Sequence, residues 1–365
     1  MAAAARPIQV GVIGYGLSAR VFQIPFVLAC SRLVLRAIVQ RHGDEAQRDH
    51  PTATIYRDAA ALFADAAVDL VIVTTPPVSH VTLASQALAA GKHVVVEKPF
   101  APTAADCDRL LAQARDSGRL LSVYQNRRWD GDFVTLQALM GTTPNPLGRL
   151  VEFESHIDRF VPPGRPPHAA WLAESAQPTT GALYEIGSHL LDQAVTLLGL
   201  PQHVTGFVAA QRGGNATAPD TFTVLLHYAG GLLATLKSSP ASAETEQLRF
   251  WVRGERGSYR KYHFDPQETQ ALEQGLGPGD PGFGVEDPAF AGRLTVYGDD
   301  GQLHTSTVPA VSPPPTYTCY YDLLAAAIDG TGPVPVPAED ARNAVRLVEL
   351  ALQSAAEGRT LAWEP

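Results

Sequence analysis

Short runs of Val, Ile and Leu that alternate with helical segments dominate the first 124 residues, and they limit the fold most strongly. The apolar runs occupy residues 8–13, 33–39, 68–75, 93–97 and 120–124. Nearly continuous aliphatic strands are typical of parallel sheets that are buried on both faces. Helices are predicted between them at residues 18–29, 79–91 and 103–118, the last with Thr103 as its N-cap. Residues 1–124 are therefore predicted to form an α/β domain with a parallel sheet.

The pattern changes after residue 125, where apolar and polar residues alternate as they do in half-exposed antiparallel strands. Strands are predicted at residues 150–160, 203–212, 220–228, 231–239, 247–254 and 257–264, with a helix at 183–198. Residues 162–178 and 265–316 are interpreted as loop-rich. Residues 125–337 are therefore predicted to form an α+β domain with a large, mostly antiparallel open sheet. A C-terminal helix and tail, residues 338–365, are predicted to pack back on the N-terminal domain.

Charge and cysteine content exclude several classes of partner and site. The 365-residue chain has a net charge of −9, so phosphate backbones and anionic lipid surfaces are poor partners. We expect neither nucleic acid nor a membrane as a partner. The three cysteines, Cys30, Cys107 and Cys319, are scattered and form no CxxC pair, which predicts neither a disulfide framework nor a zinc site. We therefore expect no metal. The start of the sequence shows no signal-peptide pattern, so we expect a cytoplasmic protein.

A glycine-rich turn follows the first strand and opens the first helix. Gly14, Gly16 and Ala19 match the G-x-G-x-x-G/A pattern of dinucleotide binding, and Tyr15 and Leu17 lie in the same loop. Gly14 permits the tight turn, and Gly16 lets the backbone approach a pyrophosphate. The alternative is a generic glycine turn, but the strand–turn–helix context favours cofactor binding.

Other strand ends carry further candidate cofactor ligands, because ligands bind at the carboxyl edge of such sheets. After the second strand, Gln40 and Arg41 stand where an acid usually holds the ribose, and no acid occurs before Asp44. Arg41 can clamp a 2′-phosphate, and a solvated turn is the equal alternative. Thr74 and Thr75 end the third run, and Pro76 and His80 follow it. His80 can instead be a histidine at the start of a helix that binds no ligand.

Two segments carry the candidate catalytic groups, which are Lys98, Glu185, His189 and Asp192, and Glu97 and Lys98 are also candidate cofactor ligands. Glu97 and Lys98 end a buried strand before Pro99, and neighbours in a strand point to opposite faces, which favours a directed lysine over a mutual ion pair. Glu185, His189 and Asp192 are spaced i, i+4 and i+7, which places them on one face of a helix. A histidine flanked by carboxylates suits a general base. The alternative is a surface face with ordinary ion pairs.

These segments, taken in order, resemble the glucose–fructose oxidoreductase / inositol dehydrogenase (Gfo/Idh/MocA) family over essentially the whole chain. The resemblance rests on GVIGYG, TTPPVSH, AGKHVVVEKPF, NRRWD, FESHIDRF, EIGSHLLDQA and the C-terminal PVPAEDARNAVRLVELALQSAAEGRTL. NRRWD and FESHIDRF are most similar to the branch of NADP-linked scyllo-inositol dehydrogenases. Two departures stand out, since Glu185 replaces the aspartate of the D-x-G-x-H motif and Pro77 replaces the asparagine of TPN-x-x-H.

The resemblance implies a Rossmann domain, an α/β domain whose open sheet often forms the oligomer interface, and catalytic roles for Lys98 and His189. We expect reversible hydride transfer between a nicotinamide and a secondary alcohol of a sugar, cyclitol or related polyol. NADP is the expected cofactor, with NAD as the alternative, and the protein is expected to be a homodimer or homotetramer. Candidate polyol contacts, for which interdomain ion pairing and packing are the alternative, are Arg127, Arg128, Trp129, Asp130, His156 and Asp158. A glycosidase that uses NAD transiently and a non-catalytic ligand-sensing regulator are the competing functions.

Overall fold

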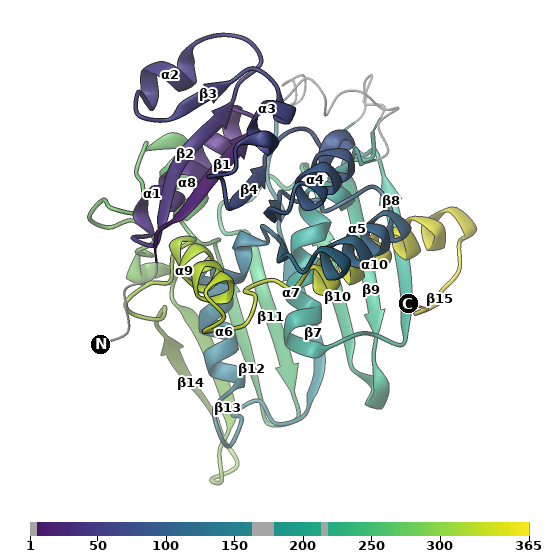
Figure 1. The fold of residues 1–365 in the computed structure, drawn as a ribbon. Helices are drawn as coiled ribbons and strands as arrows, with labels where there is room; N and C mark the ends of the chain where they lie inside the picture. Colours follow the sequence, from purple (N-terminus) through teal and green to yellow (C-terminus); the bar gives the residue numbers. More distant parts are fainter. Residues whose placement is uncertain (1–5, 163–178, 213–217, 365) are drawn as a thin grey trace. The chain divides into compact units, whose positions relative to one another are not determined.

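A computed structural model describes residues 6–162, 179–212 and 218–364 of the chain (Figure 1). Their contacts divide them into two compact units, which are described separately below. The first unit extends to Trp129 and also contains Gln267–Phe283 and Thr316–Arg342. The second contains Asp130–Pro266, Gly284–Pro315 and the chain from Asn343 onward. The predicted loop at 162–178 lies almost wholly outside the described residues.

The first unit is built on a six-stranded sheet in which every neighbouring pair is parallel, as predicted. The strand order is β3-β2-β1-β4-β5-β6. Its strands are β1 (Ile8–Ile13), β2 (Leu33–Val39), β3 (Thr54–Tyr56), β4 (Leu70–Val73), β5 (His93–Val96) and β6 (Leu121–Val123). The order reverses between β1 and β4, which is the switch point where such sheets bind ligands.

These strands are connected by the helices α1 (Ile24–Ala29), α2 (Glu45–Asp49), α3 (Ala59–Ala64), α4 (His80–Ala89) and α5 (Ala104–Ser117). Later segments of the chain add α8 (Gln267–Glu273) and α9 (Thr318–Ile328), and there are short turns η2 (Pro77–Ser79) and η3 (Asn126–Trp129). Of these helices, α2, α3, α8 and α9 were not predicted. The Thr103 side chain accepts a hydrogen bond from the Asp106 amide, which confirms the predicted N-cap. The predicted helix at 18–29 begins as a π-helix, η1 (Ser18–Gln23), before α1 continues from Ile24.

The second unit contains a nine-stranded sheet of order β14-β13-β12-β11-β7-β10-β9-β8-β15. All pairs are antiparallel except β7 with β10, so the predicted mostly antiparallel sheet is confirmed. Its strands are β7 (Leu150–His156), β8 (His203–Ala209), β9 (Thr221–His227), β10 (Leu233–Ser238), β11 (Leu248–Gly254), β12 (Gly257–Tyr262), β13 (Gly292–Tyr297), β14 (Leu303–Val308) and β15 (Leu361–Ala362).

Helices of the second unit pack on one face of its sheet. They are α6 (Gly131–Met140), η5 (Leu183–Gly187), α7 (Ser188–Leu198) and, from Asn343 onward, α10 (Ala338–Glu357), with short turns η6 (Ala229–Gly231) and η7 (Pro288–Phe290). Leu136, Leu191 and Leu347 from α6, α7 and α10 share one core with inward strand residues such as Phe153 and Val224. The opposite face of the sheet lies outside this core.

Residues 265–316 are loop-rich, as predicted, although α8, β13 and β14 also lie within them. One predicted segment differs from the structure. Residues 338–365 were expected to pack on the N-terminal domain, but the apolar face of α10 belongs to the core of the second unit. That face follows the spacing Ala344, Leu347, Val348 and Ala351, and β15 pairs with β8. The segment Thr316–Arg342, including α9, belongs instead to the first unit.

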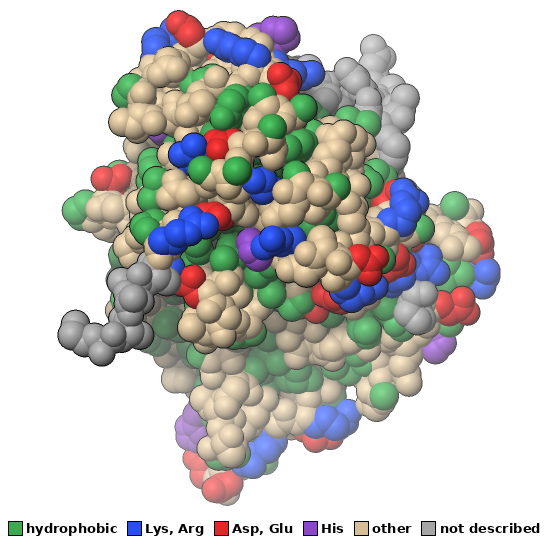
Figure 2. Space-filling view, in the orientation of Figure 1, with side chains coloured by type: hydrophobic (Ala, Val, Ile, Leu, Met, Phe, Trp, Pro, Cys, Tyr) green, Lys and Arg blue, Asp and Glu red, His purple; other side chains and the backbone are tan. Residues whose placement is uncertain are grey.

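The described residues contain no helix that is long and apolar enough to cross a membrane. On the face shown in Figure 2, positive and negative side chains are interspersed rather than gathered into a patch of one sign. This arrangement offers no extended basic surface on that face for a phosphate backbone.

Candidate active site

The glycine loop lies at the switch point of the first sheet, directly after β1. Gly14 has φ of +104°, and a Cβ there would lie 2.7 Å from Thr74 Oγ1. Thr74, which follows β4, donates from that hydroxyl to the Ile13 carbonyl over 2.9 Å. The close approach of the two strand ends therefore requires glycine at position 14.

Gly16 differs from Gly14, because a Cβ there would meet no atom of the described residues within 4 Å. Ala19, by contrast, is fully buried against the sheet. Leu17 is half-exposed, and the Tyr15 hydroxyl donates to Asp49 over 2.6 Å. The open space over Gly16 and the close packing at Ala19 fit a loop that holds a dinucleotide pyrophosphate.

The end of β2 presents an arginine that has no partner among the described residues. Gln40 accepts a hydrogen bond from the Ala46 amide at 2.8 Å and so fixes the start of α2. Asp44 pairs with Arg48 at 2.8 Å. Arg41 is exposed and makes no hydrogen bond or ion pair within the described part of the chain. Its guanidinium is thus available to a phosphate, whereas the two carboxylates that follow it in the chain are engaged, Asp44 by Arg48 and Glu45 by Gln40 Nε2.

His80 joins the loop after β4 to the turn after β5. Its Nδ1 lies 2.9 Å from the Pro99 carbonyl and its Nε2 lies 2.8 Å from the Thr75 carbonyl. The ring is fully buried, and burial lowers the pKa of His80. Thr75 Oγ1 in turn lies 2.6 Å from Ser79 Oγ, just beyond Pro76. Because both ring nitrogens face backbone carbonyls, the geometry favours a structural role for His80 over contact with a cofactor.

Glu97 is a buried acceptor at the end of β5. Its carboxylate accepts from Gln23 Nε2 at 2.6 Å, from the Lys98 amide at 3.0 Å and from the Ser18 hydroxyl. Lys98 follows it half-buried, with a cis peptide bond to Pro99. Glu97 therefore binds the glycine-loop helix and the backbone of the Lys98 turn at once.

Helix α7 carries the second group of candidate catalytic residues. His189 and Asp192 are 4% and 2% exposed, and the apolar side chains of Leu190 and Ala194 belong to the core. This burial contradicts the alternative of an ordinary solvated face. Glu185 is half-buried and lies one turn earlier in η5, where the helix is π-helical.

A buried arginine anchors α7 to the sheet. Arg249 is 1% exposed and donates to Gln193 at 2.7 Å, to Ser155 at 2.8 Å and to Asp132 at 3.0 Å. A register shift between Leu248 and Phe250 turns Arg249 to the same side as the core residue Phe250. The helix that carries His189 and Asp192 is thereby tied to β7 and α6.

The β7 candidates lie at the end of that strand. Phe153 and Ser155 face the helices, so strand alternation places His156 on the opposite face from α7. His156 lies between Glu154 and Asp158, 3.3 Å from a carboxylate oxygen of each. The other oxygen of Asp158, Oδ1, is buried and has no hydrogen-bond partner among the described residues. Asp158 thus keeps a free acceptor, while His156 is held between carboxylates.

The NRRWD segment is engaged within the protein. Arg127 pairs with Glu268, and Arg128 pairs with Asp340 at 3.1 Å, both inside the first unit. Trp129 packs edge-to-face on Tyr320 with ring centroids 5.7 Å apart. In the second unit, Asp130 is buried directly before α6. These contacts favour the packing alternative for the two arginines and Trp129.

Sequence reasoning missed two candidates. Gln125 follows β6, and its buried Oε1 has no hydrogen-bond partner among the described residues. The same holds for the buried hydroxyl of Ser188, which precedes His189. The position of Gln125 after a strand was a usable signal, whereas only the fold reveals that Ser188 is buried.

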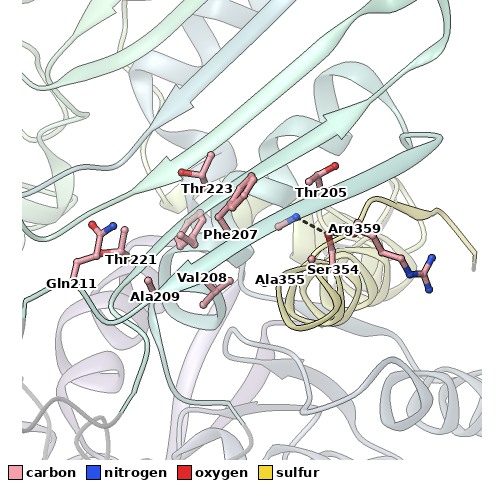
Figure 3. A pocket seen from close by; sticks show the side chains of 13 residues that line it. Thr205, Phe207, Val208, Ala209, Gln211, Thr221, Thr223, Ser354, Ala355 and Arg359 are labelled. Atoms are coloured by element: carbon pink, nitrogen blue, oxygen red, sulfur yellow. Dashed lines mark hydrogen bonds between the residues drawn. The ribbon is translucent and has the colours of Figure 1, made fainter.

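The described residues contain no group of three or more His, Cys, Asp or Glu that can hold a metal ion. The second unit has a pocket of about 470 Å³ between β8, β9 and the end of α10 (Figure 3). Its lining includes Thr205, Phe207, Thr223 and Arg359, and none of the candidate site residues. We therefore do not assign the catalytic site to this pocket.

Comparisons with known proteins agree with this architecture. Residues 8–125 match the oxidoreductase family's NAD-binding Rossmann fold, and residues 144–363 match its C-terminal alpha/beta domain. The scyllo-inositol 2-dehydrogenase (NADP(+)) IolW of Bacillus subtilis is 36% identical, over 98% of this chain and 96% of that protein. The uncharacterized oxidoreductase YdgJ of Escherichia coli is 39% identical, over 97% and 98%.

A solved structure shows the same fold. YvaA of Bacillus subtilis superposes with a TM-score of 0.91 at 36% identity, covering 98% of this chain and 99% of that one. Both halves of the chain match the family in order, and the likeness extends over nearly its full length. This chain therefore belongs to the Gfo/Idh/MocA family of oxidoreductases, with an NAD(P)-binding Rossmann domain and a C-terminal alpha/beta domain.

Proposed function

We propose that this oxidoreductase transfers a hydride reversibly between nicotinamide C4 and a secondary alcohol carbon of a sugar, cyclitol or related polyol. The observation that carries the proposal is the placement of Lys98. It is half-buried at the carboxyl end of β5, in a turn that the buried Glu97 holds to the glycine-loop helix. A relative that is 36% identical over nearly the whole chain is a scyllo-inositol 2-dehydrogenase.

The residues of this chain supply orientation and proton transfer. The bound nicotinamide cofactor supplies the redox chemistry. We assign His189 as the base that takes the hydroxyl proton, and Lys98 as the cation that orients that oxygen and stabilises its alkoxide character. Glu185 and Asp192 position His189 or substrate hydroxyls.

Unsatisfied buried oxygens support a hydroxyl-rich substrate. A polyol presents several hydroxyl donors, and the buried Asp158 Oδ1 and Ser188 Oγ lack partners among the described residues. A buried polar group without a partner costs roughly 1–3 kcal/mol, so a hydroxyl that satisfies it gains specificity. Arg127, Arg128, Trp129, Asp130 and His156 remain predicted substrate contacts, of which the arginines have ion-pair partners in the protein.

We further propose that NADP is preferred over NAD. The supporting observation is the exposed Arg41, which has no hydrogen-bond or ion-pair partner among the described residues, while Asp44 is paired with Arg48. A guanidinium binds a 2′-phosphate with two parallel hydrogen bonds, whereas a carboxylate at this place would repel it. The relative from Bacillus subtilis is also NADP-linked.

We propose that a second copy of the chain packs on the open face of the nine-stranded sheet. Large side chains on that face include Trp251, Phe207, Tyr297 and Leu303, and the last three are 58–71% exposed. Such a face suits a homodimer or homotetramer. Light scattering at micromolar concentration tests this, and a monomer alone would contradict it. We also place the protein in the cytoplasm, which agrees with three free cysteines.

The function is tested by assaying a panel of polyols and sugars with NADP and NAD. Net reduction of cofactor by a free polyol is the expected result. Release of sugar from a glycoside without net reduced cofactor would instead support the NAD-dependent glycosidase. Tight cofactor binding without turnover on any polyol would support the ligand-sensing regulator.

A further inference from the structure

A buried chain of hydrogen bonds runs from α9 to the Lys98 turn within the first unit. The Tyr321 hydroxyl donates to Gln23 Oε1, and Gln23 Nε2 donates to Glu97 Oε1 at 2.6 Å. Glu97 Oε2 then accepts from the Lys98 amide at 3.0 Å. Tyr321 and Gln23 are both completely buried. Water therefore cannot replace a lost link easily.

The same chain reaches the glycine loop. The Ser18 hydroxyl also donates to Glu97 Oε1, and Ser18 begins η1, two residues after Gly16. One carboxylate thus connects the predicted pyrophosphate loop with the backbone of the predicted catalytic lysine. Gln23 is the contact that connects this carboxylate to α9, about 300 residues later in the sequence.

The direction of each bond is set by chemistry. The Glu97 carboxylate only accepts, so Gln23 must present its NH₂ group to it and its carbonyl oxygen to Tyr321. Tyr321 must then donate. Burial raises the pKa of Tyr321 well above its ordinary value, which keeps the hydroxyl protonated as a donor. Loss of that hydroxyl would leave Gln23 Oε1 buried without its donor.

We propose that Tyr321 is a positioning residue that, through Gln23 and Glu97, fixes both Lys98 and the glycine loop for hydride transfer. The proposal rests on the catalytic role given above to Lys98. Small displacements of a catalytic group are costly, since a 1 Å misplacement can reduce the rate about 10²-fold. Tyr321 acts only through other residues, so its effect should be smaller than that of removing Lys98.

Tyr320 provides a matched control. It is the neighbouring residue on α9, is equally buried, and donates from its hydroxyl to Ser122 Oγ at 2.9 Å. Ser122 donates onward to the Val336 carbonyl and not to Glu97. Tyr320→Phe and Tyr321→Phe therefore remove the same atom from the same environment, but only the second interrupts the chain to Lys98.

The test compares both variants with the wild type in two assays. In the cofactor-free protein, amide hydrogen exchange of the peptide containing Lys98 should accelerate in Tyr321→Phe and stay at the wild-type rate in Tyr320→Phe. With cofactor and polyol, Tyr321→Phe should lower kcat on the order of 10-fold, with a smaller change in the KM for polyol. Gln23→Met, which removes both of its hydrogen bonds, should reproduce both effects.

Equal exchange at Lys98 in the two tyrosine variants would overturn the proposal, as would unchanged exchange in Tyr321→Phe and Gln23→Met. The exchange assay needs no substrate, so it tests the positioning role even if the polyol panel fails. A wild type that turns over no polyol would instead overturn the proposed function. Faster exchange together with unchanged kcat would show that the chain orders the Lys98 turn without serving catalysis, and would also overturn the proposal.

Discussion

Each unit has a buried charged residue that holds a candidate catalytic segment in place, and the two residues carry opposite charges. In the first, the buried carboxylate of Glu97 collects donors from Ser18, Gln23 and the Lys98 amide. In the second, the buried guanidinium of Arg249 donates to acceptors on three elements. Each charged group fixes the element that carries a candidate catalytic residue, Lys98 after β5 or His189 on α7.

The two groups differ in how they are neutralised. The Glu97 carboxylate accepts hydrogen bonds from three neutral donors, which are the Gln23 amide, the Ser18 hydroxyl and the backbone N–H of Lys98. Among the described residues, no cationic group pairs with its oxygens. Arg249 forms an ion pair with Asp132, which is also buried. Removing Arg249 leaves the buried charge of Asp132 uncompensated. Removing the carboxylate of Glu97 leaves only neutral donors without an acceptor. The second unit should therefore be more sensitive to loss of its central residue.

The largest expected effect concerns the two groups that these anchors position. Lys98→Ala and His189→Ala should each lower kcat by roughly 10²–10⁴-fold, because each removes a group that acts on the reacting oxygen. Cofactor affinity, measured by NADPH fluorescence titration, should stay close to that of the wild type. A variant that keeps wild-type kcat on the true substrate would show that its assigned role is wrong.

The free energies of unfolding of two variants test this comparison between Arg249 and Glu97. Arg249→Met should lower the free energy of unfolding by about 3–5 kcal/mol, because Asp132 is left buried without its cation. Glu97→Gln should cost less, about 1.5–3 kcal/mol, since the partners it loses are neutral. Urea unfolding of both variants measures the difference.

A double variant separates lost packing from lost charge. Arg249→Met with Asp132→Asn should recover part of the loss, because no unpaired buried charge remains. Asp132 Oδ2 also accepts from the Asp265 amide at 3.1 Å, a bond that asparagine retains. A double variant no more stable than Arg249→Met alone would mean that the ion pair does not explain the cost.

Substitutions of the two loop glycines should affect different properties, the stability of the fold at Gly14 and the affinity for cofactor at Gly16. Gly14→Ala should destabilise the free protein by about 1–3 kcal/mol, because alanine must adopt φ of +104° beside Thr74. Gly16→Ala should leave the stability of the free protein unchanged, since its Cβ meets no described atom within 4 Å. It should still weaken NADPH binding by narrowing the approach of the pyrophosphate. Thermal unfolding and fluorescence titration check both, and normal NADPH affinity in Gly16→Ala would argue against this binding mode.

The effect confined to a single ligand is on cofactor choice. Arg41→Ala should weaken NADP by roughly 10–100-fold and leave NAD nearly unchanged, because hydrogen bonds to a charged phosphate contribute about 1.5–3 kcal/mol. Arg109→Ala is the control, since Arg109 is an exposed arginine on α5 that pairs with Asp106 and not with a residue of the loop after β2. Equal loss of both cofactors in Arg41→Ala, or a wild type that favours NAD, would leave Arg41 as a solvated turn residue.

The two regions also differed in how much the sequence could predict. In the first unit, local rules were sufficient for five of the strands, the glycine loop and the Thr103 cap, because buried parallel strands and capping have short-range signatures. The connection from Tyr321 to Gln23 was not predictable, since it spans 298 residues. Assignment of α10 to the second unit likewise depends on which sheet its apolar face meets.

In the second unit, six of the nine described strands, β7 to β12, were predicted, but the side-chain directions were not. Alternation alone would point Arg249 and Phe250 to opposite faces, and the register shift at this point turns both inward. The strand β14 was missed because its side chains are largely exposed, and β13 because its apolar alternation is limited to Leu294 and Val296. The burial of His189 and Asp192 also needed the fold, because polar residues on one helix face suggest solvent.

The central claim is hydride transfer from a polyol carbon to the cofactor, and isotope transfer tests it most directly. The purified protein is incubated with NADP and scyllo-inositol deuterated at its carbinol carbons, followed if necessary by other deuterated polyols. The account predicts one deuterium in each reduced cofactor formed, together with an equal amount of ketone, and far slower transfer in Lys98→Ala at matched cofactor occupancy. Tight NADP binding without deuterium in the cofactor for any polyol tested would contradict it.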